Sequence, residues 1–233
     1  MQGALEEALE KIFGSEVRTI GAGRTDAGVH ALAQVVTVAA PDDIDPVKVR
    51  DSLNVMCAPS ISVHRSAIVR DDFNARFDAR SRTYVFAILE GREPDPFLAA
   101  TTLHHVEPLD LVAMNEAAGH LLGPHDFASF GRPPSPGGST ERILYRLAAS
   151  REGKVLRIEA RANAFIQQMV RSLVGTLIQV GEGRRSPSEM PDVLAACDRS
   201  AAGPVVPPQG LCLVAVEYDD GWAVPASLAA PVA

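Results

Sequence analysis

The segment from Phe165 to Val180 carries the widest apolar stripe of the sequence, and it constrains the fold more than any other segment. Its apolar side chains are Phe165, Ile166, Met169, Val170, Leu173, Val174, Leu177 and Ile178. This spacing predicts a helix with one broad apolar face, ended by Gly181-Glu182-Gly183. A face of that width has to be buried, and we expect a β-sheet to cover it.

Strand-like runs are placed along the chain so that they can form this sheet. We expect strands near residues 17–20, 33–38, 61–69, 82–89, 143–149, 155–162 and 211–218, and further helices at 3–13, 46–53, 109–122 and 190–197. The order helix, strand, strand repeats. No Gly-x-Gly-x-x-Gly turn follows a strand and no P-loop is present, so a nucleotide cofactor fold is not indicated.

These elements predict an α+β fold of two ferredoxin-like halves, residues 1–92 and 93–233, with a mixed or antiparallel central sheet and a cleft between the halves. A proline- and glycine-rich loop at residues 132–138 leads into two of the strands, and we expect it to be mobile.

Eight residues near the amino end, Arg24-Thr25-Asp26-Ala27-Gly28-Val29-His30-Ala31, combine an arginine, a carboxylate and a glycine turn. Gly21-Ala22-Gly23 precedes this octet and a strand-like run follows it. We therefore expect Asp26 on a sharply turned connection against a sheet rather than inside a helix. Asp followed by Ala-Gly is also ordinary turn chemistry, so the octet alone leaves a purely structural role open.

Four further blocks accompany the octet. They are Phe73-Asn74-Ala75-Arg76-Phe77-Asp78-Ala79 with Arg82-Thr83-Tyr84, then His125-Asp126-Phe127-Ala128-Ser129-Phe130, then Phe165 through Arg171 with Val174-Gly175, and Gly210-Leu211 with the final strand. Together with the octet, these blocks resemble those of the TruA-type tRNA pseudouridine synthases, from the first helix to Tyr218. The resemblance implies a pseudouridine synthase fold that converts uridine to pseudouridine in the anticodon stem-loop of tRNA, at positions thirty-eight to forty. It also implies that no cofactor is used and that the protein is a homodimer.

The resemblance further implies roles for individual residues. Asp26 corresponds to the nucleophile, Tyr84 to the tyrosine that contacts the target uracil, and Arg171 to an arginine that pairs with the nucleophile. Arg24, two residues before Asp26, is placed to fill the space that a flipped base leaves. Three more residues are assigned to substrate binding: Arg76, Arg82 and His30.

Two of these residues have plain structural alternatives. Tyr84 could be a core aromatic on a strand, and Arg171 could be a surface arginine at the edge of the helix stripe. The chemistry itself requires the N1–C1′ bond of uridine to break and the base to rejoin the sugar through C5, for which a carboxylate nucleophile suffices. Attack at C1′ and attack at C6 of the ring both remain open.

The amino end departs from the family pattern. Members begin with a strand that contains a Tyr-Asp-Gly turn and a Gly-Trp-Gln segment, whereas this sequence begins at Met1-Gln2-Gly3, directly at the first expected helix. We expect the natural protein to be longer, with Met1 standing where the family has a valine encoded by GTG. The missing first strand is an interior strand of a ferredoxin-like half, so its loss would expose the unpaired edges of the neighbouring strands.

The net charge of −7 argues against a polyanionic partner, but the positive charge is segregated. Residues 142–185 contain eight arginines and Lys154 against Glu152, Glu159 and Glu182, a balance of 9 − 3 = +6. We expect these arginines to contact RNA phosphates, because the guanidinium fork suits that contact. An Ala- and Arg-rich composition can also reflect GC-rich codons.

Other features narrow the class of protein. Cys57, Cys197 and Cys212 are too far apart in sequence for a Cys-x-x-Cys pair, so we expect neither disulfides nor a structural zinc site. No apolar run reaches the 18 residues of a membrane span, and the start lacks a signal peptide pattern, so we expect a cytoplasmic protein without membrane contact.

Two rival functions stay open beside the synthase. One is an RNA-binding protein of the same fold without catalysis. The other is a metal-dependent hydrolase that would use His120, His125 and Asp126, although no His-Glu-x-x-His pattern supports it and we expect no metal site.

Overall fold

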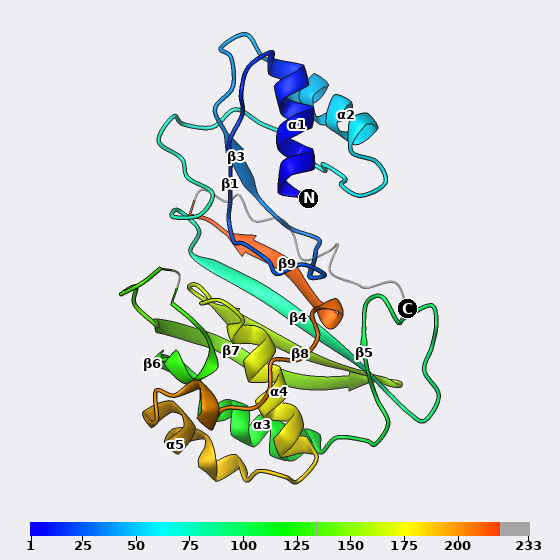
Figure 1. Cartoon of the computed structure of the whole chain (residues 1–233), viewed down its shortest axis with the longest axis vertical. Coiled ribbons are helices and arrows are strands. Elements are labelled where there is room, and N and C mark those ends of the chain that lie inside the picture. Colours follow the sequence, from blue (N-terminus) through cyan, green and yellow to red (C-terminus); the bar gives the residue numbers. More distant parts are fainter. Residues whose placement is uncertain (134, 220–233) are drawn as a thin grey trace. The chain divides into compact units, whose positions relative to one another are not determined.

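A computed structural model describes residues 1–133 and 135–219 of the chain (Figure 1). The described residues form two compact units, one of residues 1–23 with 35–78 and one of residues 24–34 with 79–133 and 135–219. The boundary between these units does not fall at residue 92, where the sequence predicted the division into two halves. The strand that precedes residue 92 is hydrogen bonded within the second unit, so it belongs to that unit. The division into ferredoxin-like halves stays a prediction.

The first unit packs two helices and a two-stranded sheet. Helix α1 (Gln2–Phe13) contacts α2 (Pro46–Met56), and strand β1 (Thr19–Gly21) pairs antiparallel with β3 (Val36–Val38). Ala8 and Leu9 of α1 are buried in the same core as Val49 and Leu53 of α2. Helix α2 begins where the Asp45 side chain accepts hydrogen bonds from the first free backbone N–H groups, the usual role of an N-cap aspartate.

The second unit is built on a seven-stranded sheet in the order β2-β9-β4-β8-β7-β6, with β5 paired to β4. The strands are β2 (His30–Ala31), β4 (Ser81–Glu90), β5 (Leu103–His105), β6 (Gly123–Asp126), β7 (Glu141–Glu152), β8 (Val155–Ala162) and β9 (Leu211–Glu217). The β2–β9 and β4–β5 pairs are parallel and the others are antiparallel. The predicted α+β class with a mixed sheet is confirmed.

Helices α3 (Leu111–Gly119), α4 (Met169–Gly181) and the short α5 (Met190–Ala195) also belong to the second unit (Figure 1). Period-two alternation along β4 and β8 buries Phe86, Ile88, Leu156 and Ile158 on one face of the sheet. Leu173 of α4 is fully buried as well. The apolar stripe therefore lies where the sequence predicted, on a buried helix.

Two expected elements differ from the structure. Residues 61–69 form no strand, because the side-chain amide of Asn54 takes both backbone groups of Val63, with Val63 N to Oδ1 at 2.6 Å and Nδ2 to Val63 O at 3.0 Å. The alternating apolar residues pack on the helices instead. The helix expected from Phe165 begins only at Met169, because Gln168 has a left-handed φ of 66° and interrupts the helix.

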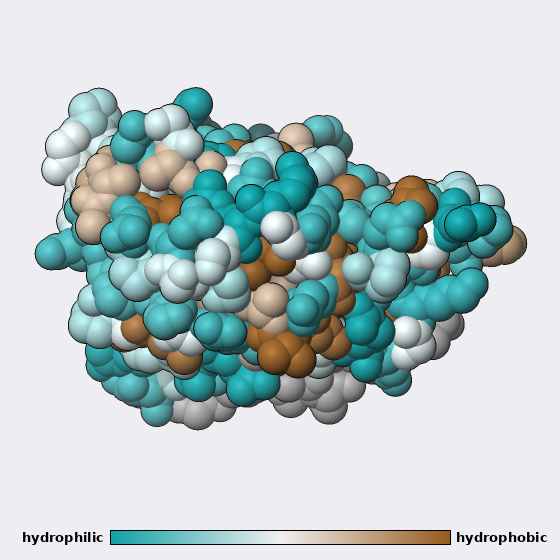
Figure 2. Space-filling view, turned by 90° about the horizontal axis from the view of Figure 1, so that it is seen from below, coloured by the Kyte–Doolittle hydropathy of each residue, from teal (hydrophilic) through white to brown (hydrophobic). Residues whose placement is uncertain are grey.

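Over the residues that the structure describes, no helix is long and apolar enough to span a membrane. In the space-filling view of Figure 2, hydrophobic residues on the displayed face are bordered by hydrophilic ones. The expected mobility of the loop at 132–138 stays a prediction, and residue 134 lies outside the described residues.

A buried ion pair fixes the carboxyl end of β4. Glu90 is 8% exposed and accepts hydrogen bonds from Arg151 Nε at 2.6 Å and from the Leu109 N–H at 2.8 Å. Burial raises the pKa of Glu90, but the hydrogen bonds from Arg151 and Leu109 outweigh it, so the pKa lies below its ordinary value of 4.5.

We expect Glu90→Gln to lower the free energy of unfolding at pH 7 by about 2 kcal/mol, since it weakens hydrogen bonds to a charged partner. A lowered folded-state pKa stabilises the protein above the unfolded-state pKa, and that stability is lost as the pH falls through the folded-state pKa. The difference between wild type and variant should therefore narrow below about pH 4.5. Urea titrations over pH 3–7 check this, with exposed Glu116→Gln as the matched control. Equal stability of the variant and wild type at pH 7 would contradict it.

Candidate active site

The octet forms a tight turn between β1 and β2, as the sequence predicted. The Val29 N–H donates to the Asp26 carbonyl oxygen at 3.1 Å, and Gly28 has a φ of 86°. A positive φ at the third turn position favours glycine. A methyl group on Gly28 would also lie 2.9 Å from Pro208 Cγ. Both the backbone conformation and the close contact therefore require glycine two residues after Asp26.

Strand β9 holds the residues that follow the turn. His30 and Ala31 run parallel to Cys212 and Leu213, and the N–H groups of Leu32 and Ala33 both donate to the Leu213 carbonyl oxygen, at 2.9 and 3.3 Å. Asp26 is thus presented by a short loop whose far end is part of the sheet.

Helix α4 brings Arg171 to this loop. Arg171 Nη1 lies 2.8 Å from Asp26 Oδ2, and its Nε donates to the Val206 carbonyl oxygen at 2.6 Å. The Arg171 side chain is 13% exposed and the Asp26 side chain 29% exposed, so water screens the pair less than a surface ion pair. Two contacts on different atoms of one planar guanidinium fix its orientation.

The Val206 carbonyl is itself held by a close packing of backbones, between α4 and the segment 203–206, which we call the strap. A methyl group on Gly175 would lie 1.9 Å from the Pro204 carbonyl oxygen, and one on Gly203 would lie 2.7 Å from the Thr176 backbone. The Gly203 N–H donates to Thr176 Oγ1 at 2.8 Å. The strap can approach α4 this closely only because both glycines lack side chains.

Tyr84 lies on β4, opposite Ala160 of β8 and Leu213 of β9. The residue is 7% exposed, and its ring meets Phe165 edge to face, with ring centroids 5.3 Å apart. Burial raises the pKa of Tyr84 to about 12, opposed by the charge of Arg82 and assisted by the charge of Asp26 and by Cys212. The phenol therefore stays protonated around neutral pH.

The other predicted site residues have different surroundings. Arg82 is 7% exposed, and its Nη1 donates to the carbonyl oxygens of Ala79 at 2.9 Å and Asn163 at 2.7 Å. His30 is exposed, with Nε2 2.9 Å from the Ala100 carbonyl oxygen. These contacts give both side chains partners within the protein, and their assignment to substrate binding stays a prediction.

Arg24 and Arg76 are both exposed. Within the described part of the chain, the structure records no hydrogen bond or ion pair of the Arg24 side chain. Arg76 belongs to the first unit and Asp26 to the second. Of the predicted set, the structure joins Asp26 and Arg171 by a direct contact, and both lie with Tyr84 in the second unit.

The sequence missed the partners that hold these groups. The sequence placed Phe165 only in the apolar stripe and in one of the blocks, and it predicted no role for residues 203–206. A signal was present in Gly203-Pro204 and Pro207-Pro208, which are unusual directly before a strand.

The basic stretch is largely neutralised within the protein. Six of its eight arginines form ion pairs: Arg146 with Glu159, Arg151 with Glu90, Arg157 with Glu152, Arg161 with Glu217, Arg171 with Asp26 and Arg184 with Glu182. The charge count of this segment therefore overstates the positive surface that it offers to a polyanion.

Two of the three residues of the hydrolase hypothesis, His125 and Asp126, make local contacts. His125 Nε2 lies 2.9 Å from the Leu122 carbonyl oxygen, and Asp126 accepts from the Ala128 N–H at 2.9 Å. Across residues 1–133 and 135–219, no group of three or more His, Cys, Asp or Glu side chains is placed to hold a metal ion.

Comparison with known proteins identifies the family. A family model described as tRNA pseudouridine synthase matches residues 117–219. A tRNA pseudouridine synthase A of Rhodopseudomonas palustris (strain BisA53) is 46% identical over 221 residues, covering 94% of this chain and 89% of the relative. The chain belongs to the tRNA pseudouridine synthase A family. Relatives of the same name from Mesorhizobium japonicum and Bordetella petrii are each 42% identical over 94% of this chain, covering 89% and 82% of their own lengths.

The family assignment confirms the resemblance noted in the sequence. The matched region 117–219 includes α4 with Arg171, the strap and β9, while the Asp26 loop lies outside it. The loop is covered by the longer matches to the synthase A relatives.

We expect Gly175→Ala to lower the free energy of unfolding by about 2 kcal/mol, because the added methyl group overpacks the contact with Pro204. Gly119→Ala on α3 is the matched control, since a methyl group there meets no atom within 4 Å. Urea unfolding of both variants checks the expectation. Wild-type stability of Gly175→Ala would contradict the close packing.

Proposed function

We propose that this protein isomerises uridine to pseudouridine in the anticodon stem-loop of tRNA, at positions thirty-eight to forty, with Asp26 as the nucleophile and without a cofactor. The observation that carries the proposal is the ion pair between Asp26, which is held on a fixed turn, and Arg171. Burial raises the pKa of Tyr84, and the charge of Asp26 adds to that rise. Membership of the synthase A family supports the reaction class.

The ion pair leaves one carboxylate oxygen for chemistry. Arg171 engages Asp26 Oδ2, and among the described residues no contact of Oδ1 is recorded. In the proposed reaction, Oδ1 bonds to the nucleotide and the N1–C1′ bond breaks. The base turns, C5 bonds to C1′, and the bond between Oδ1 and the nucleotide breaks, which returns the free carboxylate. C5 then loses a proton and N1 gains one, so atoms and electrons balance without an external oxidant or reductant. The arginine stabilises the charged carboxylate before attack.

Aromatic side chains provide the surface for the turning base. The ring of Tyr84 lies against Phe165, and its hydroxyl group stays protonated around neutral pH, so it can donate a hydrogen bond to a uracil oxygen. Stacking on an aromatic ring contributes about 1 to 3 kcal/mol per base in single-strand binders.

The target base must leave its stack before it can reach Asp26, which costs a few kcal/mol. Arg24 is exposed on the same turn, two residues before Asp26. We assign it to the space that the flipped base vacates, where a planar guanidinium can stack on the neighbouring bases.

The proposal extends to the assembly. A homodimer in the cytoplasm that grips one tRNA accords with the family, and phosphate contacts are assigned to the arginines of residues 142–185. Because six of them are ion-paired, these contacts require exchange of a carboxylate for a phosphate or sharing of one guanidinium between both.

We expect Asp26→Asn to abolish turnover, with a loss on the order of a thousand-fold or more, because the amide is a far weaker nucleophile of the same shape. Tritium release from tRNA labelled at uridine C5 measures turnover, and a filter-binding assay should show that tRNA binding is retained. Exposed Asp43→Asn is the control. Equal turnover in Asp26→Asn would contradict the nucleophile, and wild-type protein that binds tRNA without releasing tritium would indicate a non-catalytic binder.

We expect Arg171→Lys to lower kcat by about 10- to 100-fold with KM changed little, since an ammonium group cannot reach both Asp26 and Val206 as the guanidinium fork does. Steady-state kinetics on the same substrate check this, with exposed Arg18→Lys as the control. A rise in KM at unchanged kcat would instead indicate that Arg171 only binds substrate.

A further inference from the structure

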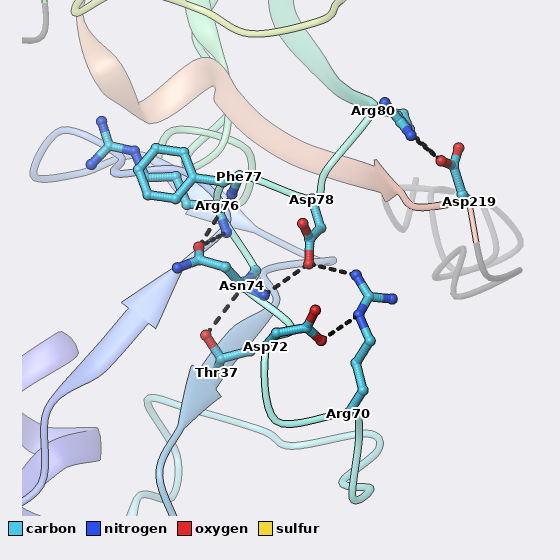
Figure 3. A network of polar contacts seen from close by, with 10 residues as sticks. Thr37, Arg70, Asp72, Asn74, Arg76, Phe77, Asp78, Arg80 and Asp219 are labelled. Atoms are coloured by element: carbon cyan, nitrogen blue, oxygen red, sulfur yellow. Dashed lines mark hydrogen bonds and ion pairs between the residues drawn. The ribbon is translucent and has the colours of Figure 1, made fainter.

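The first unit presents an aromatic and a cationic side chain together at its surface. The ring of Phe77 is 78% exposed, and the guanidinium carbon of Arg76 lies 5.7 Å from the centre of that ring. Figure 3 shows the two side chains next to each other, turned away from Arg70 and Asp72. A large apolar ring held open to water calls for a physical explanation.

The exposure does not come from a loose loop. Asn74 Oδ1 accepts hydrogen bonds from the N–H groups of Arg76 at 2.9 Å and Phe77 at 3.2 Å, so one oxygen fixes the backbone of both residues (Figure 3). Asp78 closes the turn, with its N–H bonded to the Asn74 carbonyl and its Oδ2 accepting from the Asn74 N–H at 2.9 Å. The pair therefore stands on a rigid turn.

The acids nearest in sequence are engaged by another arginine. Arg70 pairs with Asp72 through Nε and with Asp78 through Nη2, each at 2.9 Å (Figure 3). These ion pairs add to the hydrogen bonds that fix the turn.

We propose that Arg76 and Phe77 form a platform for RNA, on which an unpaired base stacks against Phe77 while Arg76 contacts an adjoining phosphate. Single-stranded loops of RNA are recognised in this way, by aromatic rings and guanidinium planes that take splayed-out bases. Only an unpaired nucleotide offers a free π-face and a phosphate within the reach of two adjacent side chains. The platform rests on the proposed function in one respect, namely that the RNA it binds is tRNA.

The platform assigns a role to Phe77, to which the sequence analysis gave no function, and it specifies the chemistry expected of Arg76. We assign it to RNA binding and not to the chemical step.

The test compares binding of an anticodon stem-loop RNA with binding of a fully paired duplex of equal length, by fluorescence anisotropy on the full chain. We expect Phe77→Ala to weaken stem-loop binding by about 5- to 100-fold and to leave duplex binding unchanged, since stacking needs an unpaired base. Phe77→Trp should bind within about threefold of wild type because it keeps the ring. Arg76→Ala should weaken binding of both RNAs and reduce the salt slope by about one.

Val55→Ala is the matched control, because Val55 is an apolar side chain of the same unit that is 81% exposed. Thermal unfolding of each variant shows whether it is folded, and the Phe77→Trp variant keeps the test valid if Phe77→Ala is unstable. Stem-loop binding by Phe77→Ala equal to that by Val55→Ala would overturn the platform. So would a change in sedimentation mass in Phe77→Ala, which would make the surface a contact between protein chains.

The platform and the proposed reaction can fail separately. Wild-type protein that forms no pseudouridine while Phe77→Ala still binds the stem-loop less tightly would overturn the reaction and support the platform. Full turnover together with unchanged stem-loop binding in Phe77→Ala would overturn the platform and support the reaction.

Discussion

The candidate site depends on one ion pair between residues 145 positions apart in the chain, Asp26 on a surface turn and Arg171 on a buried helix. A partly buried pair of this kind stabilises a protein only if its remaining hydrogen-bonding groups are satisfied. The Val206 carbonyl oxygen satisfies a second donor of Arg171. The carboxylate is therefore held by a group that cannot itself swing away.

Glycines make this arrangement possible, because they allow backbone to meet backbone. Gly175 and Gly203 let the strap lie directly on α4, and Gly28 lets the Asp26 turn lie on Pro208, two residues after the strap. Close contacts thus run from the helix through the strap to the turn. The residues after the turn are then hydrogen bonded to Leu213 of β9. A side chain at any of these glycines would shift the position of a charged group.

Much of this fold follows from the sequence, and the reasons for success and failure are physical. The apolar stripe after Phe165 and the alternation of residues 82–89 predicted a buried helix and a strand, because burial alone determines both patterns. At residues 61–69 the apolar alternation predicted a strand that does not form, because the Asn54 amide takes the backbone hydrogen bonds that a partner strand would make. No local signal in the sequence reveals this contact. Asp26 and Arg171 could be named from motifs, but the strap that orients them depends on long-range packing.

The basic stretch gives a second lesson. Counting charges along residues 142–185 predicted a strongly positive surface, yet most of its arginines are neutralised by carboxylates, several from distant strands or loops, such as Glu90 and Glu217. Sequence spacing cannot show such pairing, because strand order brings these residues together. The acidic residues of the chain serve in part to orient its arginines.

The measurement that tests the account most directly is a double-mutant cycle on the free energy of unfolding, with Asp26→Asn, Arg171→Met and the combined variant. A direct, partly buried contact predicts a coupling free energy of about 1 kcal/mol or more between the two side chains. Losses that add to within about 0.3 kcal/mol would mean that the two side chains act independently, and would contradict the account.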